Sequence, residues 1–285
     1  MDDEIEGSRA PLLEHLVELR NRLIVCVAAL AVGFVVCFIF ANPLFLALVR
    51  PYQMAQSLLD QQHGAGRHGP FDLLFAVIGL KPLPPGQAVN LVFTGPLEFF
   101  FTKMKLAGFG AIVITFPVLA SQLYRFVAPG LYKRERRAFL PFLMAAPVLF
   151  AMGAALVYFI MLPFVLWFSL SQQIVNPSVH VSLLPKVSDY LTLVTNLLVA
   201  FGLCFQLPVV LSLAGLAGLV DSKQLGGFRR YAVVAIVFVA ALVTPPDPIS
   251  QLLLAAPIYL LYEISIVCVK LIERGRAKEE GAAAA

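Results

Sequence analysis

The chain has 285 residues, of which 60% are hydrophobic and 13% are charged, and its formal net charge is +4. So few polar residues do not cover the apolar surface of a soluble globular protein, which excludes an ordinary soluble enzyme. We therefore predict an all-α, polytopic membrane protein in which residues 1–285 form one integral-membrane domain, and we expect no nucleic-acid partner.

The first predicted element is an amphipathic cytoplasmic helix within residues 1–22, directly before the first apolar run at 23–41. Leucines at helical spacing form one side of it, and Glu18 and Arg22 lie on the other side. Because they are four residues apart, Glu18 and Arg22 can pair with each other; alternatively, Glu18 offers its carboxylate to a cationic partner. The leucines are Leu12, Leu16, Leu19 and Leu23.

Residues 42–105 are predicted to form a long external connection between the first two spans. This segment contains turn sequences rich in glycine and proline between residues 63 and 86. The apolar stretch 71–80 is too short to cross a bilayer, so we expect it at the interface or in a packed cap.

Five more apolar runs follow this connection. Those at about 106–124, 138–168 and 190–211 are long enough to cross a hydrocarbon core of about 30 Å. The last two, at 231–243 and 252–269, are shorter, and the first of them would reach only about 20 Å as a helix. We therefore predict six transmembrane helices, of which the last two form a short hairpin that thins the bilayer locally.

The distribution of basic residues predicts that both termini lie in the cytoplasm. Basic residues cluster before the first span, between the second and third, between the fourth and fifth, and after the sixth, where residues 270–285 form a cytoplasmic tail. The connection between the third and fourth spans holds only Lys186, and that between the fifth and sixth holds no basic residue. The clustered residues are Arg9, Arg20, Arg22, Arg125, Lys133, Arg134, Arg136, Arg137, Lys223, Arg229, Arg230, Lys270, Arg274, Arg276 and Lys278.

Three polar side chains are candidates for function. Glu135 lies among basic residues in the segment 126–137, which is either a solvated charge run that contacts anionic lipid or a site where a carboxylate stays ionised for a cationic ligand. Gln206, beside Pro208 in the fourth span, forms either a helix-to-helix hydrogen bond or part of a substrate path. Glu263, late in the sixth span, is either a buried proton-sensitive group or an interfacial charge.

The sequence contains no pattern for catalysis or for metal or cofactor binding. The four cysteines lie in apolar runs without CxxC spacing, so we expect packing residues, and the four histidines lie outside these runs. No HExxH, GxSxG or GxxxxGK[ST] motif occurs. We therefore predict that the protein is not an enzyme and has no metal site or cofactor.

Three longer motifs occur in order: LLEHLVELRNRL at residues 12–23, FVAPGLYKRERR at 126–137 and LVTPPD at 242–247. In these motifs the sequence closely resembles the TatC family, the receptors of the twin-arginine protein translocase, and the resemblance extends over about residues 11–270. It implies a receptor in the cytoplasmic (inner) membrane for folded proteins whose signal peptide carries two adjacent arginines. Export in this family is driven by the proton-motive force.

By motif position, Glu18 and Glu135 match the family's acidic residues implicated in recognising the arginine pair. A carboxylate suits this role because it accepts two parallel hydrogen bonds from a guanidinium, which an ammonium does not offer. Further residues match positions near this recognition surface, and Pro51 matches a position in its external support. The further residues are Arg20, Gln122, Phe126 and Arg137.

The family resemblance also implies single-span TatA-like and TatB-like partners, which dock along the fifth and sixth helices of an oligomeric complex. Leu242, Thr244 and Gln251 match the docking positions. The sequence departs from many relatives in having Gln206 in place of a glutamate, and its external segment 60–88 is longer than in compact members. A secondary transporter of small solutes is the alternative function, but the sequence shows neither midplane ionisable groups nor repeat symmetry.

Overall fold

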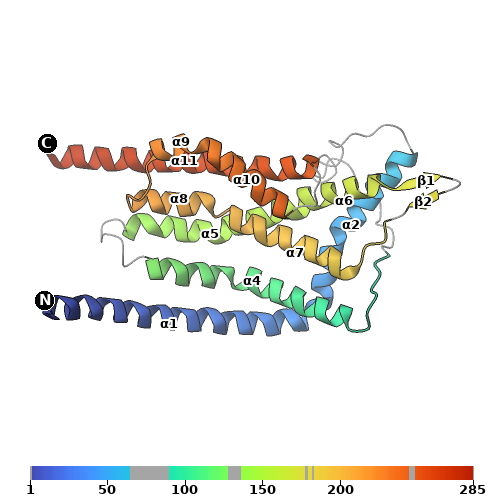
Figure 1. Ribbon diagram of the computed structural model, residues 1–285, viewed down its shortest axis with the longest axis horizontal. Coiled ribbons are helices and arrows are strands. Elements are labelled where there is room, and N and C mark those ends of the chain that lie inside the picture. The colour runs from blue at the N-terminus through green and yellow to red at the C-terminus, as the bar shows by residue number, and fades with distance from the viewer. Residues whose placement is uncertain are drawn as a thin grey trace.

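The structure, a computed structural model, describes the backbone of residues 2–64, 90–127, 136–176, 179–181, 183–243 and 248–284. It describes the side chains of residues 16–57, 59, 90–126, 144–173, 183–243, 248 and 251–275. Most of these residues are helical, and most helices run along the long axis of the molecule (Figure 1). The all-α prediction is confirmed, apart from a small antiparallel hairpin of β1 (Ile174–Asn176) and β2 (Val179–Val181).

The first helix, α1 (Asp2–Ile39), is continuous, so the predicted amphipathic helix and the first span form one element. It lies lengthwise beside α4 (Glu98–Val127) (Figure 1), and small residues line the contact. A Cβ added to Gly33 of α1 would lie 2.8 Å from Thr115 Cγ2 of α4, which leaves no room for a larger residue. This close approach, typical of membrane helix pairs, sets the first half of α1 beside the last turns of α4.

Helix α2 (Ala41–Gly64) occupies the start of the segment 42–105, where the sequence predicts a long connection and indicates no helix. The end of that segment belongs to α4. Leu48, Tyr52 and Ala55 recur at helical spacing and are buried, and α2 packs mainly against α6. The stretch 71–80 lies outside the described residues.

The third predicted span is one helical path with a wide turn in its middle. It consists of α5 (Arg136–Leu156), the π-turn η2 (Val157–Met161) and α6 (Leu162–Ser171). The wide turn ends at Met161, two residues before Pro163, which occupies the first turn of α6 and lacks a backbone N–H.

The fourth predicted span is broken into two helices. Two residues separate α7 (Val187–Cys204) from α8 (Leu207–Leu216), and Pro208 occupies the first turn of α8. Proline is favoured in the first turn of a helix, where its missing N–H costs no helical hydrogen bond, and Pro208 occupies such a position just after the break. Gln206 therefore lies at the junction of the two helices.

The last predicted hairpin is asymmetric. After the short α9 (Ser222–Gly227), α10 (Arg229–Val243) has 15 residues and reaches only about 22 Å, as predicted. α11 (Pro248–Ala284) has 37 residues, so the prediction that both helices are short is wrong for the last one. Glu263 does not interrupt α11, and the charged residues after it include no proline, so the helix continues through most of the predicted tail 270–285.

Five helical segments in the described part are long and apolar enough to cross a membrane. α10 is not among them because of its length. The N- and C-terminal ends of the chain lie at the same end of the molecule, and α2 with the β hairpin lies at the opposite end (Figure 1). The five segments are Leu16–Ile39, Glu98–Phe126, Met144–Ser171, Val187–Leu216 and Gln251–Gly275.

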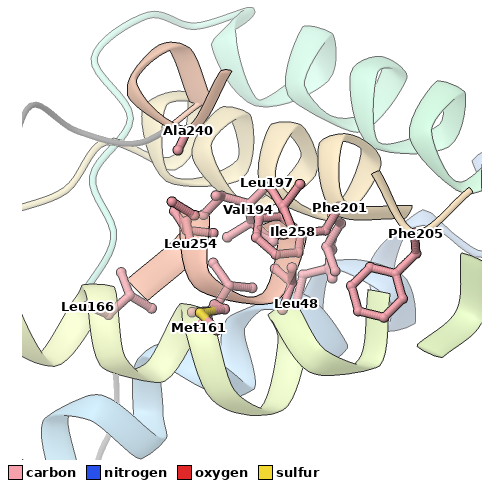
Figure 2. Packing of buried hydrophobic residues seen from close by; sticks show 14 of the residues in the cluster. Leu48, Met161, Leu166, Val194, Leu197, Phe201, Phe205, Ala240, Leu254 and Ile258 are labelled. Atoms are coloured by element: carbon pink, nitrogen blue, oxygen red, sulfur yellow. The ribbon is translucent and has the colours of Figure 1, made fainter. Parts of the chain in front are cut away.

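The largest buried core surrounds α7. Figure 2 shows Val194 and Leu197 of α7 gathered with Leu48 of α2, Met161 of η2 and Leu254 of α11. Half of the most apolar stretch of the α7–α8 segment is buried, against 11% for that of α1. α7 is therefore the central helix, whereas α1 is a peripheral helix held mainly by α4.

Candidate functional site

Glu18, Arg22 and Gln122 form a polar cluster where α1 and α4 lie side by side. Arg22 Nη2 lies 2.7 Å from Glu18 Oε1, and Arg22 Nη1 donates to Gln122 Oε1 at 3.2 Å. The predicted pairing of Glu18 with Arg22 is confirmed, and the guanidinium also joins α1 to α4. The Glu18 and Arg22 side chains are 32% and 27% exposed, so the ion pair is accessible to a ligand.

An open cavity of about 370 Å³ lies beside this cluster. Its lining combines the ion pair of Glu18 and Arg22 with the amides of Asn21 and Gln122 and with the apolar side chains of Val17 and Val25. A cationic group on an extended chain would find there an anionic acceptor, neutral hydrogen-bonding groups and apolar contacts. The site is therefore chemically suited to a guanidinium or an ammonium ligand.

The other residues predicted at the recognition surface are described in part. Arg20 is exposed on α1. Phe126 is half-buried near the end of α4, one turn beyond Gln122. Arg137 is placed in α5 by its backbone alone, and Glu135 lies outside the described residues.

Gln206 connects two helices at the break between α7 and α8. Its buried Nε2 donates to the Ala146 carbonyl of α5 at 3.0 Å and lies 3.5 Å from the Gly202 carbonyl. The backbone N–H of Gln206 bonds to the Leu203 carbonyl at 2.9 Å instead of to Gly202, so the helix is already irregular here. This geometry matches the interpretation of Gln206 as a helix-to-helix hydrogen bond.

Glu263 forms an ion pair between α10 and α11. Arg229 Nε lies 2.8 Å from Glu263 Oε1, and Arg229 Nη2 donates to Glu263 Oε2 at 2.9 Å, which is a two-bond fork. Tyr259, one turn earlier in α11, donates to Oε1 at 2.9 Å. The Arg229 side chain is 51% exposed, so this geometry matches a charge at the surface and not a buried proton-sensitive group.

The residues predicted to bind partner subunits lie on α10 and at the start of α11. Leu242 is 72% exposed and continues an exposed stripe with Val234 and Phe238, each four residues apart. Gln251 Nε2 donates to a backbone carbonyl of α10 at 3.1 Å, so this side chain stabilises the hairpin. Thr244 lies outside the described residues.

The cysteines in the described part of the chain are free thiols with buried or half-buried side chains, as expected for packing residues. No group of three or more His, Cys, Asp or Glu residues among the described side chains is arranged to hold a metal ion. The thiols are Cys26, Cys37, Cys204 and Cys268.

The family model described as "Sec-independent protein translocase protein (TatC)" matches residues 14–257. The chain belongs to the TatC family. The TatC protein of Magnetococcus marinus is 40% identical over 96% of this chain and 89% of its own length. TatC of Aquifex aeolicus is 37% identical, over 93% and 96% of the two chains, and TatC of Escherichia coli K12 is 33% identical, over 95% and 92%.

Solved TatC structures share the fold. A crystal structure described as the twin arginine translocase receptor TatC is 33% identical, covers 90% of this chain and 98% of its own, and superposes with a TM-score of 0.68. A second structure of the same receptor, in DDM, covers 89% and 98% with a TM-score of 0.69. The arrangement of helices around the cluster is therefore that of the TatC family.

Pro51, the residue that the TatC resemblance places in the external support, is buried within α2. Proline lacks the N–H that would bond to the carbonyl of Ala47, four residues earlier. The Tyr158 hydroxyl of η2 donates to this carbonyl at 2.6 Å, and one residue further on Tyr190 of α7 donates to the Leu48 carbonyl at 2.7 Å. Two phenols therefore tie α2 to its neighbours, and one of them compensates for the proline.

Glu98 is a structural residue that the sequence reasoning missed. Its carboxylate accepts hydrogen bonds from Ser188 Oγ at 2.7 Å and from the backbone N–H groups of Thr94 and Gly95 at 2.7 and 3.2 Å. These bonds join the start of α4 to the start of α7. The signal was present in the sequence, because a turn of threonine, glycine and proline followed by an acidic residue is typical of a helix N-terminus.

Proposed function

We propose that this TatC-family chain is the receptor of a twin-arginine translocase, which binds the signal peptides of folded proteins and forms the core of their export machinery. Glu18 carries the proposal, because its carboxylate already holds a guanidinium at 2.7 Å beside an open cavity. Glu135, which lies outside the described residues, is proposed to receive the second arginine. Arg20, Gln122, Phe126 and Arg137 complete the proposed surface.

Recognition of arginine over lysine follows from the geometry of the two cations. A guanidinium presents donors in a planar fork that matches both oxygens of a carboxylate, whereas an ammonium makes a point contact. Such charge-assisted bonds contribute about 1.5–3 kcal/mol each when partly shielded from water. Two acidic residues that each hold one arginine would make the pair of arginines the recognised unit.

The proposed orientation places the cluster on the cytoplasmic side of the inner membrane, with six spans and both termini inside. The basic residues that flank α1, α4, α10 and α11 support this orientation. The shared position of the two termini supports an even number of crossings (Figure 1). α10, about 22 Å long, would then cross only a thinned bilayer.

The proposed partners are TatA-like and TatB-like single-span proteins in an oligomeric complex, with anionic lipids around the basic loops. The exposed stripe of Val234, Phe238 and Leu242 offers a single-span helix an apolar face along α10. The energy for export is proposed to come from the proton-motive force, without a catalytic step or cofactor in this chain. A small-solute transporter is less well supported, because Gln206 is engaged with the backbone of a neighbouring helix.

Export of a reporter with a twin-arginine signal tests this function. In cells that depend on this chain, we expect the unaltered protein to export the reporter and Glu18→Gln to reduce export strongly, while export of unfolded proteins by other routes continues. Equal amounts of both proteins in the membrane are the control. Normal export by Glu18→Gln would remove Glu18 from recognition, and failure of the unaltered chain to export the reporter would contradict the receptor function.

A further inference from the structure

We infer that Arg22 is an internal competitor for the Glu18 carboxylate, which an arginine of the signal peptide displaces, and that Gln122 retains the displaced Arg22. The inference rests on the proposed function of Glu18 as the acceptor of a signal-peptide arginine. It makes Arg22 a residue that sets the affinity of the site, in addition to its pairing within α1.

The Arg22–Glu18 pair forms only one of the two parallel hydrogen bonds that a guanidinium and a carboxylate can make. Arg22 directs Nη2 to one carboxylate oxygen and Nη1 to Gln122 on the other helix, and its buried Nε has no partner in the described part of the chain. Arg229 in the same protein binds Glu263 through two nitrogens and both oxygens. Arg22 therefore holds its carboxylate by one bond where a fork makes two.

An incoming arginine gains from this arrangement. Its fork offers Glu18 two parallel bonds in exchange for the single bond of Arg22. The displaced guanidinium keeps its bond to Gln122 and is 27% exposed, so it is not left as a buried unpaired charge. The exchange thus costs the single bond between Arg22 and Glu18. A cationic segment that binds Glu18 more weakly than Arg22 does would not displace Arg22 and would not occupy the site.

The seam between α1 and α4 keeps this exchange local. Gly33 lies against Thr115 so closely that a Cβ would lie 2.8 Å from its methyl group, which fixes the separation of the two helices. Gln122 therefore stays within reach of Arg22 whether or not Arg22 is bound to Glu18. The cavity beside them has room for the incoming side chain, since its volume is about 370 Å³.

The test measures binding of a labelled synthetic peptide with an Arg-Arg pair to the purified full chain in detergent. We expect Arg22→Gln to tighten binding by about two-fold, which is the worth of an accessible i,i+4 ion pair. The affinity for a Lys-Lys peptide should increase by a similar factor, because the variant removes Arg22 as a competitor for both peptides. Arg22→Lys, which keeps the charge but not the fork, should give a smaller gain.

The control for simple loss of charge is Arg125→Gln, which removes an exposed arginine three residues from Gln122 and should leave the affinity unchanged. Weaker binding by Arg22→Gln would mean that Arg22 positions Glu18, and unchanged binding would mean that it does not compete; either result overturns the inference. Glu18→Gln separates the two proposals. If this variant binds the peptide as the unaltered chain does, the proposed function is refuted. If Glu18→Gln loses binding but Arg22→Gln does not bind more tightly, only the role of Arg22 as a competitor is refuted.

Discussion

The two ends of the molecule are held together by different chemistry. At the end that holds the termini, α1 and α4 are joined by the partly exposed Arg22, which pairs with Glu18 on α1 and donates to Gln122 on α4. At the opposite end, α2 is held by the neutral hydroxyls of Tyr158 and Tyr190, which donate to backbone carbonyls. An exposed ion pair exchanges for a ligand at small cost, whereas a buried neutral bond leaves an unsatisfied carbonyl when it breaks. We therefore assign recognition to the first end and support to the second.

The core around α7 should stabilise the whole fold, including both ends of the molecule. Phe201→Ala removes a side chain that is 2% exposed, and we expect a loss of about 3–5 kcal/mol in the free energy of unfolding, because the cavity is enclosed by several helices. Unfolding in detergent is measured by the fluorescence of the single tryptophan, Trp167. Leu203→Ala, at a side chain that is 56% exposed, is the matched control. Similar losses for the two variants would contradict the assigned core.

Glu18→Gln should affect recognition without affecting stability. We expect the binding free energy for an Arg-Arg peptide to weaken by about 1.5–3 kcal/mol, because a charge-assisted bond becomes a neutral one. The melting temperature should stay nearly constant, since an accessible ion pair adds little to stability. Glu263→Gln breaks another ion pair and should leave peptide affinity unchanged. A large loss of stability by Glu18→Gln would make this end structural as well.

Tyr158→Phe should show the opposite pattern at the other end. We expect a loss of about 1–2 kcal/mol in stability, because the Ala47 carbonyl loses its donor, with unchanged peptide affinity. Tyr231→Phe, at an exposed phenol, is the control. Adding Pro51→Ala to Tyr158→Phe should recover part of the loss, since alanine restores the N–H that faces this carbonyl. No recovery in the double variant would contradict the compensation.

Gln206→Leu should have the smallest effect of the four. It removes one hydrogen bond to Ala146, and we expect a loss of about 1 kcal/mol in stability with a proportionate loss of export. Gln206→Glu should keep export, because a protonated carboxyl still donates a hydrogen bond. Both variants are compared by melting temperature and export of the reporter. Lost export at unchanged melting temperature would place Gln206 in a substrate path instead.

Much of the fold was predictable because apolar runs of membrane length reveal spans directly. The break before Pro208 agrees with the preference of proline for the first turn of a helix, whereas Pro117 and Pro257 lie inside the continuous helices α4 and α11. α2 was missed because it contains Pro51, which the sequence alone marks as a helix breaker, whereas in the structure the Tyr158 hydroxyl donates to the carbonyl that the proline leaves without its helical partner. The length of α11 was missed because residues 270–285, which follow the apolar run, were predicted as a tail, whereas the helix continues through most of them.

The candidate site was predictable only where its residues are close in sequence. The spacing of Glu18 and Arg22 predicts their contact, because residues four apart are neighbours on a helix. Gln122 lies 100 residues from Arg22, and no local pattern links them; the contact depends on how closely α1 and α4 pack. The family resemblance indicated Gln122 as part of the site, but its bond to Arg22 required the three-dimensional structure.

Photocrosslinking from Asn21 tests the central claim most directly, because Asn21 lines the cavity beside Glu18. A photoreactive residue at this position, in the purified full chain, should crosslink to an Arg-Arg signal peptide. The crosslink should weaken strongly with a Lys-Lys peptide and be lost when Glu18→Gln is added. Equal crosslinking of both peptides, or crosslinking that persists with Glu18→Gln, would contradict recognition of the arginine pair at this site.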